Sequence, residues 1–145
     1  MQIYAVIDTN VIVSALISRS NDAPTVRVLK EVLNGRLIPL YHAEILHEYN
    51  EVLSRDKFHL DKELIKTVID SIITNGKEVF PKPTGEILVD MDDLIFYEVA
   101  MEKQDDNSYL VTGNMKHYPI RDFIVTPYEM MCILDETEKN TNNAL

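Results

Sequence analysis

The sequence predicts an α/β fold of three layers, in which helices cover both faces of a parallel β-sheet. Short apolar runs alternate along the chain with segments of helical periodicity. These runs lack the alternation of a half-exposed sheet, which is typical of strands buried on both faces. The 145 residues, 46% of them hydrophobic, suffice for one substantial core. We therefore expect a single domain over residues 1–134 and a polar, frayed tail over residues 135–145.

The first predicted strand, residues 4–7, runs directly into an acid, Asp8. Parallel sheets bind ligands outside the carboxyl ends of their strands, which is where Asp8 lies. Apolar residues recur at helical spacing after Asn10, so Asp8 stands at a strand-to-helix turn beside the positive end of a helix dipole. A carboxylate there serves as a metal ligand, a phosphoryl acceptor or a helix cap. The helix cap is the commonest of these three roles, so the positions of the other acids must show whether Asp8 has another one.

The next segment predicts a second helix and a second strand. Asn21 or Asp22 is expected to cap the helix, with Pro24 in its first turn, and Asn34-Gly35 ends it. Residues 37–41 form the strand, in which Pro39 favours an irregular or less central position.

A third helix is predicted from about Ala43 to Ser54. On a helical wheel Glu48 lies at the margin of its apolar face, from which it can reach across the top of the sheet. An ordinary boundary glutamate, with a packed stem and a wet head, has the same pattern. Asp61 begins a fourth helix that ends at Asn75-Gly76, and residues 78–80 are a short strand candidate.

Three acids, Asp90, Asp92 and Asp93, precede a well-buried helix that starts near residue 94. Capping and dipole compensation account for one or two of them without any function. Residues 109–112 form a fourth strand, which delivers Asn114 to its carboxyl end. Residues 120–125 hold the fifth strand, and a final helix runs from Thr126-Pro127 to about residue 134.

Charge and composition limit the function classes. The net charge is −10, with 24 acidic against 14 basic residues, which argues against a surface that coats nucleic acid but not against nucleic acid as a substrate. Cys132 is the only cysteine, which excludes an intrachain disulfide and a thiol-rich metal site. No segment has the length of a membrane span and no signal-peptide pattern occurs, so we expect a cytoplasmic protein without membrane contact.

Under the predicted fold, Asp8, Glu48, Asp92 and Asn114 meet at one rim of the sheet. Like charges at such short range repel, and a divalent cation removes that cost. Oxygen donors without cysteine or paired histidines favour Mg²⁺ or Mn²⁺ over Zn²⁺.

Four short motifs follow one another along the chain: Asp8-Thr9-Asn10-Val11, Glu48-Tyr49-Asn50-Glu51-Val52-Leu53, Asp92-Asp93-Leu94-Ile95 and Val111-Thr112-Gly113-Asn114. In this order they resemble the motifs of PIN domains, the metal-dependent ribonucleases best known as VapC-type toxins of toxin–antitoxin pairs. The segment from Leu110 to Pro119 is similar to a branch described as toxin components. The resemblance spans roughly residues 3 to 130.

This resemblance implies a five-stranded parallel sheet and a Mg²⁺ or Mn²⁺ site. It makes Asp8, Glu48 and Asp92 the matching acids, with Asn114 where the family often has another acid. Asp90 and Asp93 are weaker candidates for ligands. The polar positions that hold the site or a phosphate are matched by Asn10, Ser14 and Thr112, of which Thr112 is best placed to orient a ligand.

The implied activity is endoribonuclease cleavage by an attacking water, which Glu48 or Asp92 positions or deprotonates. Arg19, Lys116 and His117 are candidate RNA contacts, although exposed basic residues more often only solubilise. The expected partners are RNA, a small antitoxin protein and a second copy of the chain in a homodimer.

Rival functions are weaker. A haloacid-dehalogenase-type phosphotransferase needs a second acid where this chain has Asn10, and a receiver domain carries its phosphoacceptor on a middle strand rather than the first. No P-loop motif occurs. The serious alternative is a catalytically weak PIN-like interaction module, which Asn114 and the negative charge favour modestly.

Overall fold

A computed structural model describes residues 1–143. Five parallel strands form one sheet in the order β3-β2-β1-β4-β5. The strands are β1 (Ile3–Ile7), β2 (Leu37–Tyr41), β3 (Lys77–Glu78), β4 (Ser108–Val111) and β5 (Ile124–Val125). The helices are α1 (Thr9–Ile17), α2 (Pro24–Leu33), α3 (Ala43–Leu53), α4 (Lys62–Asn75), α5 (Leu94–Glu102) and α6 (Pro127–Asn143).

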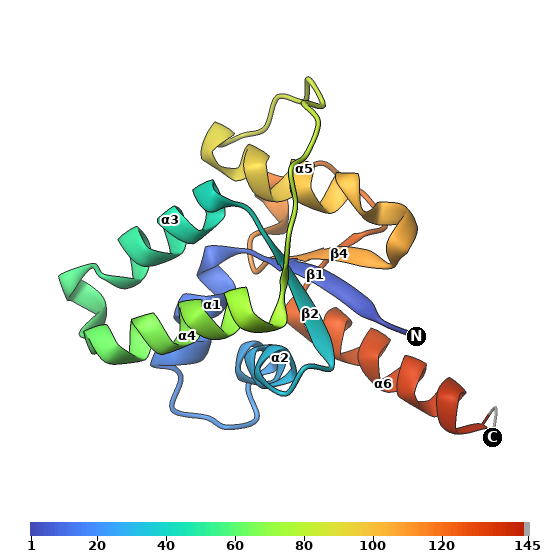
Figure 1. Cartoon of the computed structure of the whole chain (residues 1–145), viewed down its shortest axis with the longest axis horizontal. Coiled ribbons are helices and arrows are strands. Elements are labelled where there is room, and N and C mark those ends of the chain that lie inside the picture. Colours follow the sequence, from blue (N-terminus) through green and yellow to red (C-terminus); the bar gives the residue numbers. More distant parts are fainter. Residues whose placement is uncertain (144–145) are drawn as a thin grey trace.

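The helices cover both sides of the sheet, so the expected three-layer α/β/α fold with a five-stranded parallel sheet is confirmed. Figure 1 shows α5 on one face and α2 with α6 on the other. The central strand β1 is buried on both faces, with Ala5 and Val6 fully inaccessible to solvent. This burial explains why its sequence is continuously apolar rather than alternating.

One local expectation is corrected. Neither Asn21 nor Asp22 caps α2, because the residue at that position is Ala23, directly before Pro24. As expected, Pro39 lies in a less central strand, β2, where it is opposite Ala5 of the central strand β1. The neighbour on its other side begins only at Lys77, opposite Leu40. Pro39 therefore lies beyond the end of that short ladder, where its missing N–H is not needed.

The carboxyl-terminal helix is longer than its sequence indicates. α6 continues through Asn143, past the expected end near residue 134, and Figure 1 shows its last turns projecting from the body. Arg36, which lies between α2 and β2, forms ion pairs with Asp135 and Glu138 of α6. Residues 135–143 are thus helical instead of a frayed tail, and residues 144–145 lie outside the described part. Among residues 1–143, no helix combines the length and apolar character that crossing a membrane requires.

Candidate active site

Asp8 is the buried acid at the carboxyl end of β1, and only 5% of it is exposed. It precedes α1, but its side chain makes no capping hydrogen bond. Instead, its Oδ2 accepts two hydrogen bonds, from the Thr112 hydroxyl at 2.8 Å and from the Tyr118 hydroxyl at 3.0 Å. The segment that follows β4 therefore holds this carboxylate in place.

Burial dominates the electrostatics of Asp8. It raises the pKa of the carboxyl above its ordinary value, and the two hydroxyls that stabilise the charged form offset only part of the increase. No lysine or arginine within residues 1–143 forms an ion pair with Asp8. A buried carboxylate without a cationic partner is costly to ionise, and a bound cation would remove that cost.

Glu48 lies on α3, and its side chain extends toward the start of α1, next to Asp8. Its carboxylate accepts a hydrogen bond from the hydroxyl of Thr9, the residue that follows Asp8. Burial raises its pKa, the bond from Thr9 opposes the rise, and the charges of Asp8, Asp92 and Asp90 add to it. The expected convergence of the α3 glutamate on the end of β1 is present in the structure.

The acids before α5 divide into two environments. A 3₁₀ turn, η2 (Met91–Asp93), begins at Asp90, whose Oδ1 accepts a hydrogen bond from the Asp92 backbone N–H at 2.9 Å. Asp93 then turns inward, where its Oδ2 lies 3.2 Å from the Nδ1 of His117. Burial and the charges of Asp8 and Asp90 raise the pKa of Asp93 to about 6, while the contact with His117 lowers it in part.

Asp92, in contrast, is exposed and lines a separate surface hollow with His42 and Glu44. Its charge still acts on Glu48. Asp93 is the acid that contacts His117 and on which the charge of Asp8 acts, although the sequence ranks it lower than Asp92.

The segment after β4 contributes polar groups at the same rim. The Asn10 Oδ1 accepts a hydrogen bond from the Gly113 N–H at 3.1 Å, which ties the start of α1 to the end of β4. The Asn114 N–H donates to the Thr112 hydroxyl at 2.9 Å. Thr112 therefore accepts from one neighbour and donates to Asp8, which fixes the orientation of its hydroxyl.

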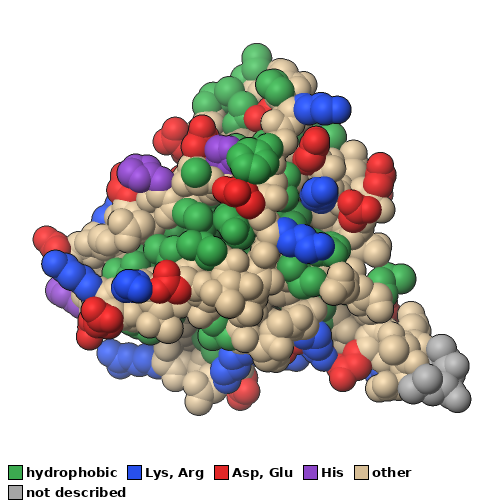
Figure 2. Space-filling model, in the orientation of Figure 1, with side chains coloured by type: hydrophobic (Ala, Val, Ile, Leu, Met, Phe, Trp, Pro, Cys, Tyr) green, Lys and Arg blue, Asp and Glu red, His purple; other side chains and the backbone are tan. Residues whose placement is uncertain are grey.

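Three other predicted residues lie outside this cluster of carboxylates. Ser14 is exposed, and its hydroxyl contacts the Thr25 hydroxyl on α2 at 3.3 Å. Arg19 and Lys116 are exposed and form no ion pair within the described chain. Figure 2 shows positive and negative side chains interspersed over the visible face, without a broad basic surface.

Sequence reasoning missed two residues, Thr9 and Tyr118. Thr9 is adjacent to Asp8, so its contact with Glu48 depends on a helix that lies 39 residues further along the chain. Tyr118 follows the 3₁₀ turn η4 (Met115–His117) and is 6% exposed. A tyrosine in a loop gives no pattern by which its hydroxyl could be assigned to Asp8.

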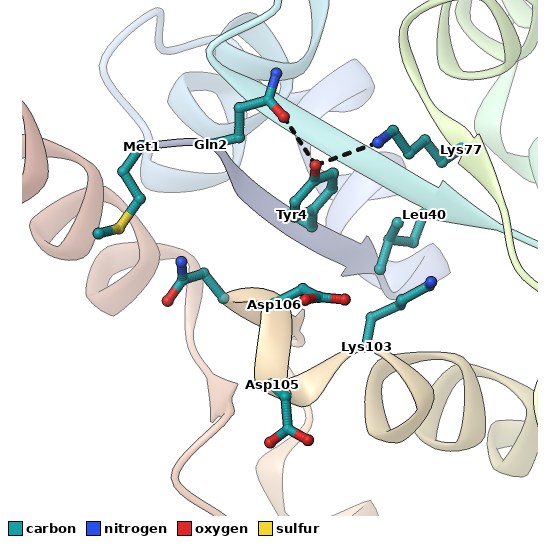
Figure 3. A pocket seen from close by; sticks show the side chains of 9 residues that line it. Met1, Gln2, Tyr4, Leu40, Lys77, Lys103, Asp105 and Asp106 are labelled. Carbon is teal, nitrogen blue, oxygen red and sulfur yellow. Dashed lines mark hydrogen bonds between the residues drawn. The ribbon is translucent and has the colours of Figure 1, made fainter.

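A hollow of about 460 Å³ lies at the opposite end of β1 and is a separate feature (Figure 3). Its floor includes Tyr4 and Leu40, and its rim includes Lys77, Lys103 and Asp106. The Tyr4 hydroxyl donates to Gln2 at 2.8 Å and accepts from the Lys77 ammonium at 3.3 Å. None of the acids around Asp8 lines this hollow, so it is not the candidate site.

The chemistry of the carboxylate cluster suits a divalent cation. Asp8 is close enough to Glu48 and to Asp93 for its charge to raise the pKa of both carboxyls. Asp90, Asp93 and His117 also offer one donor atom each, all within 4.8 Å of one another. Carboxylate and amide oxygens are the ligands that Mg²⁺ and Mn²⁺ prefer.

Comparison with known families agrees with this geometry. A family model described as a PIN domain matches residues 4–116, which include β1, all the acids named above and the end of β4. No curated protein matches the chain.

Proposed function

The chain belongs to the PIN-domain family, whose members are generally metal-dependent nucleases, and on that premise we propose that it is an endoribonuclease dependent on Mg²⁺ or Mn²⁺. The observation that carries the proposal is that the buried Asp8 has two further carboxylates near it, Glu48 and Asp93, and that none of the three has a lysine or arginine partner within residues 1–143. These carboxylates can hold a divalent cation, and the cation can in turn bind a phosphate group that the carboxylates alone would repel.

The residues have distinct roles in this proposal. When bound, the cation polarises the scissile phosphate and lowers the pKa of a water molecule. Asp8 would be the first ligand of the cation, and the hydroxyls of Thr112 and Tyr118 orient its carboxylate. Glu48 has a raised pKa and a free side toward the other acids, so it positions the attacking water or takes its proton.

Asp93 takes the place that the sequence assigns to Asp92. Its inward position beside Asp8 supports a ligand role, with Asn114 as a neutral and weaker contributor. Asp92 is left as an exposed neighbour whose charge adds to the negative potential of the rim. The proposed substrate contacts are Lys116 and Arg19, whose exposed cations can reach the phosphates of an RNA chain.

The nuclease proposal is tested by Asp8→Asn in purified protein. The variant should lose Mn²⁺-dependent RNA cleavage and keep its fold by circular dichroism. Asp22→Asn is a matched control, because Asp22 is an exposed acid in the loop before α2. An unchanged cleavage rate in Asp8→Asn would refute the assignment. Metal-independent binding to a protein partner without cleavage by the wild type would support the catalytically weak interaction module instead.

We further propose that this nuclease is the toxin of a toxin–antitoxin pair, active in the cytoplasm as a homodimer. The family membership and the similarity of the segment from Leu110 to Pro119 to toxin components support this role. It predicts that a neighbouring reading frame encodes a small DNA-binding protein, and that adding this protein suppresses RNA cleavage. Light scattering on the purified chain tests the dimer.

A further inference from the structure

We propose that Asp90, Asp93 and His117 form a cation position of their own, in which an imidazole nitrogen selects Mn²⁺, Co²⁺ or Zn²⁺ over Mg²⁺. The three residues come from η2 and η4, two short turns that meet beside Asp8. The inference rests on the proposed function only in that Asp93 is shared with the carboxylate cluster. It changes the role of His117 from an RNA contact to a ligand.

The spacing of the donor atoms supports this site. One donor atom from each residue lies within 4.8 Å of the other two. The Asp93 Oδ2 and the His117 Nδ1 are 3.2 Å apart. Two donors at that separation, each about 2.1 Å from a common cation, subtend an angle of about 100°. This angle lies between the octahedral and the tetrahedral values, so both atoms can bind one ion without moving apart.

Two of the ligands are already fixed in place. The Asp93 side chain is 15% exposed and belongs to the residue that directly precedes α5. His117 is held by its own turn, in which its N–H donates to the Asn114 carbonyl at 3.0 Å. A fixed pair of ligands loses little conformational freedom when it binds an ion.

Asp90 is the third ligand of the proposed site, and its side chain is the one that can change its conformation. Its Oδ1 is engaged by the Asp92 N–H, and its exposed position leaves the carboxylate room to rotate. A common cation requires donor separations of at most about 4.2 Å at the same bond length, so the Asp90 carboxylate is the group that rotates to meet the ion.

Charge balance also favours an ion over a simple side-chain pair. The contact between Asp93 and His117 satisfies one carboxylate. Asp90 has no lysine or arginine partner within residues 1–143, although it lies close enough to raise the pKa values of both Asp93 and Glu48. A divalent cation between the three side chains neutralises both acids together.

The nitrogen donor determines which ions bind. Mg²⁺ keeps to oxygen ligands and retains most of its water, whereas imidazole suits the later transition metals. A mixed set of two carboxylates and one imidazole therefore discriminates between cations in a way that an all-carboxylate set does not.

The test is a titration of the metal-free full chain with Co²⁺, followed by visible absorption and by calorimetry, with Mg²⁺ titrated separately. His117→Asn should abolish the nitrogen contribution to the Co²⁺ spectrum and weaken Co²⁺ binding by at least about tenfold, the lower end of the loss for an outer-shell partner. Mg²⁺ binding should stay unchanged. His47→Asn is the control, because His47 lies on α3 with its side chain 81% exposed.

Each outcome is informative. An unchanged Co²⁺ spectrum and affinity in His117→Asn would overturn the inference, as would equal losses for Co²⁺ and Mg²⁺, which would show that His117 only positions Asp93. Asp8→Asn should retain the nitrogen-dependent Co²⁺ site. RNA cleavage by the wild-type protein in Mg²⁺ is measured in parallel. If the protein cleaves RNA but shows no nitrogen-dependent Co²⁺ binding, only this inference is refuted. If it binds Co²⁺ in this way but does not cleave RNA, only the nuclease proposal is refuted.

Discussion

Removing the charge of Asp93 should stabilise the metal-free protein at neutral pH. The pKa of this carboxyl rises from 3.8 to about 6 on folding, so folding disfavours its ionised form. For an acid with a raised pKa, the unfolded state gives up its proton first as the pH rises. The folded state therefore loses stability between about pH 4 and pH 6, and the loss persists at higher pH.

The magnitude follows from the size of the shift. About two pKa units at about 1.4 kcal/mol each correspond to roughly 3 kcal/mol of destabilisation at pH 7.5. Asp93→Asn removes this term but weakens the contact with His117, which costs about 1 kcal/mol. The net expectation is a gain of about 2 kcal/mol, equivalent to a melting temperature higher by about 4–8 °C for a chain of this size.

The assay is urea unfolding with a chelator present, at pH 7.5 and at pH 3.5. Asp93→Asn should be more stable than the wild type at pH 7.5 and no more stable at pH 3.5, where the wild-type carboxyl is already protonated. Asp92→Asn is the matched control, since Asp92 is the exposed adjacent acid, and it should change stability by less than about 0.5 kcal/mol. The reasoning fails if Asp93→Asn is no more stable at pH 7.5, or if its gain is the same at both pH values.

Three further predictions concern the surroundings of Asp8 and the edge of the sheet. Asn114→Asp should tighten Mn²⁺ binding in calorimetry and lower the stability of the metal-free protein, because another acid joins the cluster; an unchanged affinity would mean that Asn114 does not face the ion. Tyr118→Phe should weaken Mn²⁺ binding by about tenfold, since Asp8 loses one of the two hydroxyls that orient it; equal affinities would show that Thr112 suffices. Gly76→Ala should destabilise the fold by about 1–3 kcal/mol in urea unfolding, because a Cβ there would lie less than 3.0 Å from the Pro39 carbonyl oxygen.

The sequence predicted the fold because its strongest signals are local. The apolar run of β1 and the glycines after α2 and α4 each determine an element without reference to distant contacts. The convergence of Asp8 and Glu48 was also predictable, because Asp8 follows a strand and Glu48 lies at the margin of the apolar face of a helix that packs beside that strand end. The length of α6 was not, because residues 135–143 lack an apolar stripe and pair with Arg36, which lies far away in the sequence.

The choice between Asp92 and Asp93 depends on geometry that the sequence does not contain. Adjacent residues in a turn point in different directions, so a shift of one residue exchanges an inward acid for an exposed one. The 3₁₀ turn that begins at Asp90 sets this direction. The roles of Thr9 and Tyr118 depend likewise on contacts between segments 39 and 110 residues apart.

Asp8 and its two hydroxyl partners lie far apart in the sequence, and this has a consequence for the order in which the chain is synthesised. Thr112 and Tyr118 follow Asp8 by 104 and 110 residues, and β4, which directly precedes Thr112, is the immediate neighbour of β1. On the ribosome, Asp8 and Glu48 are made long before the strand and the hydroxyls that complete their surroundings. A nascent chain that stops before Ser108 lacks an interior strand of its sheet and both hydroxyl partners of Asp8. The surroundings of Asp8 are therefore completed only after the carboxyl-terminal segment has emerged.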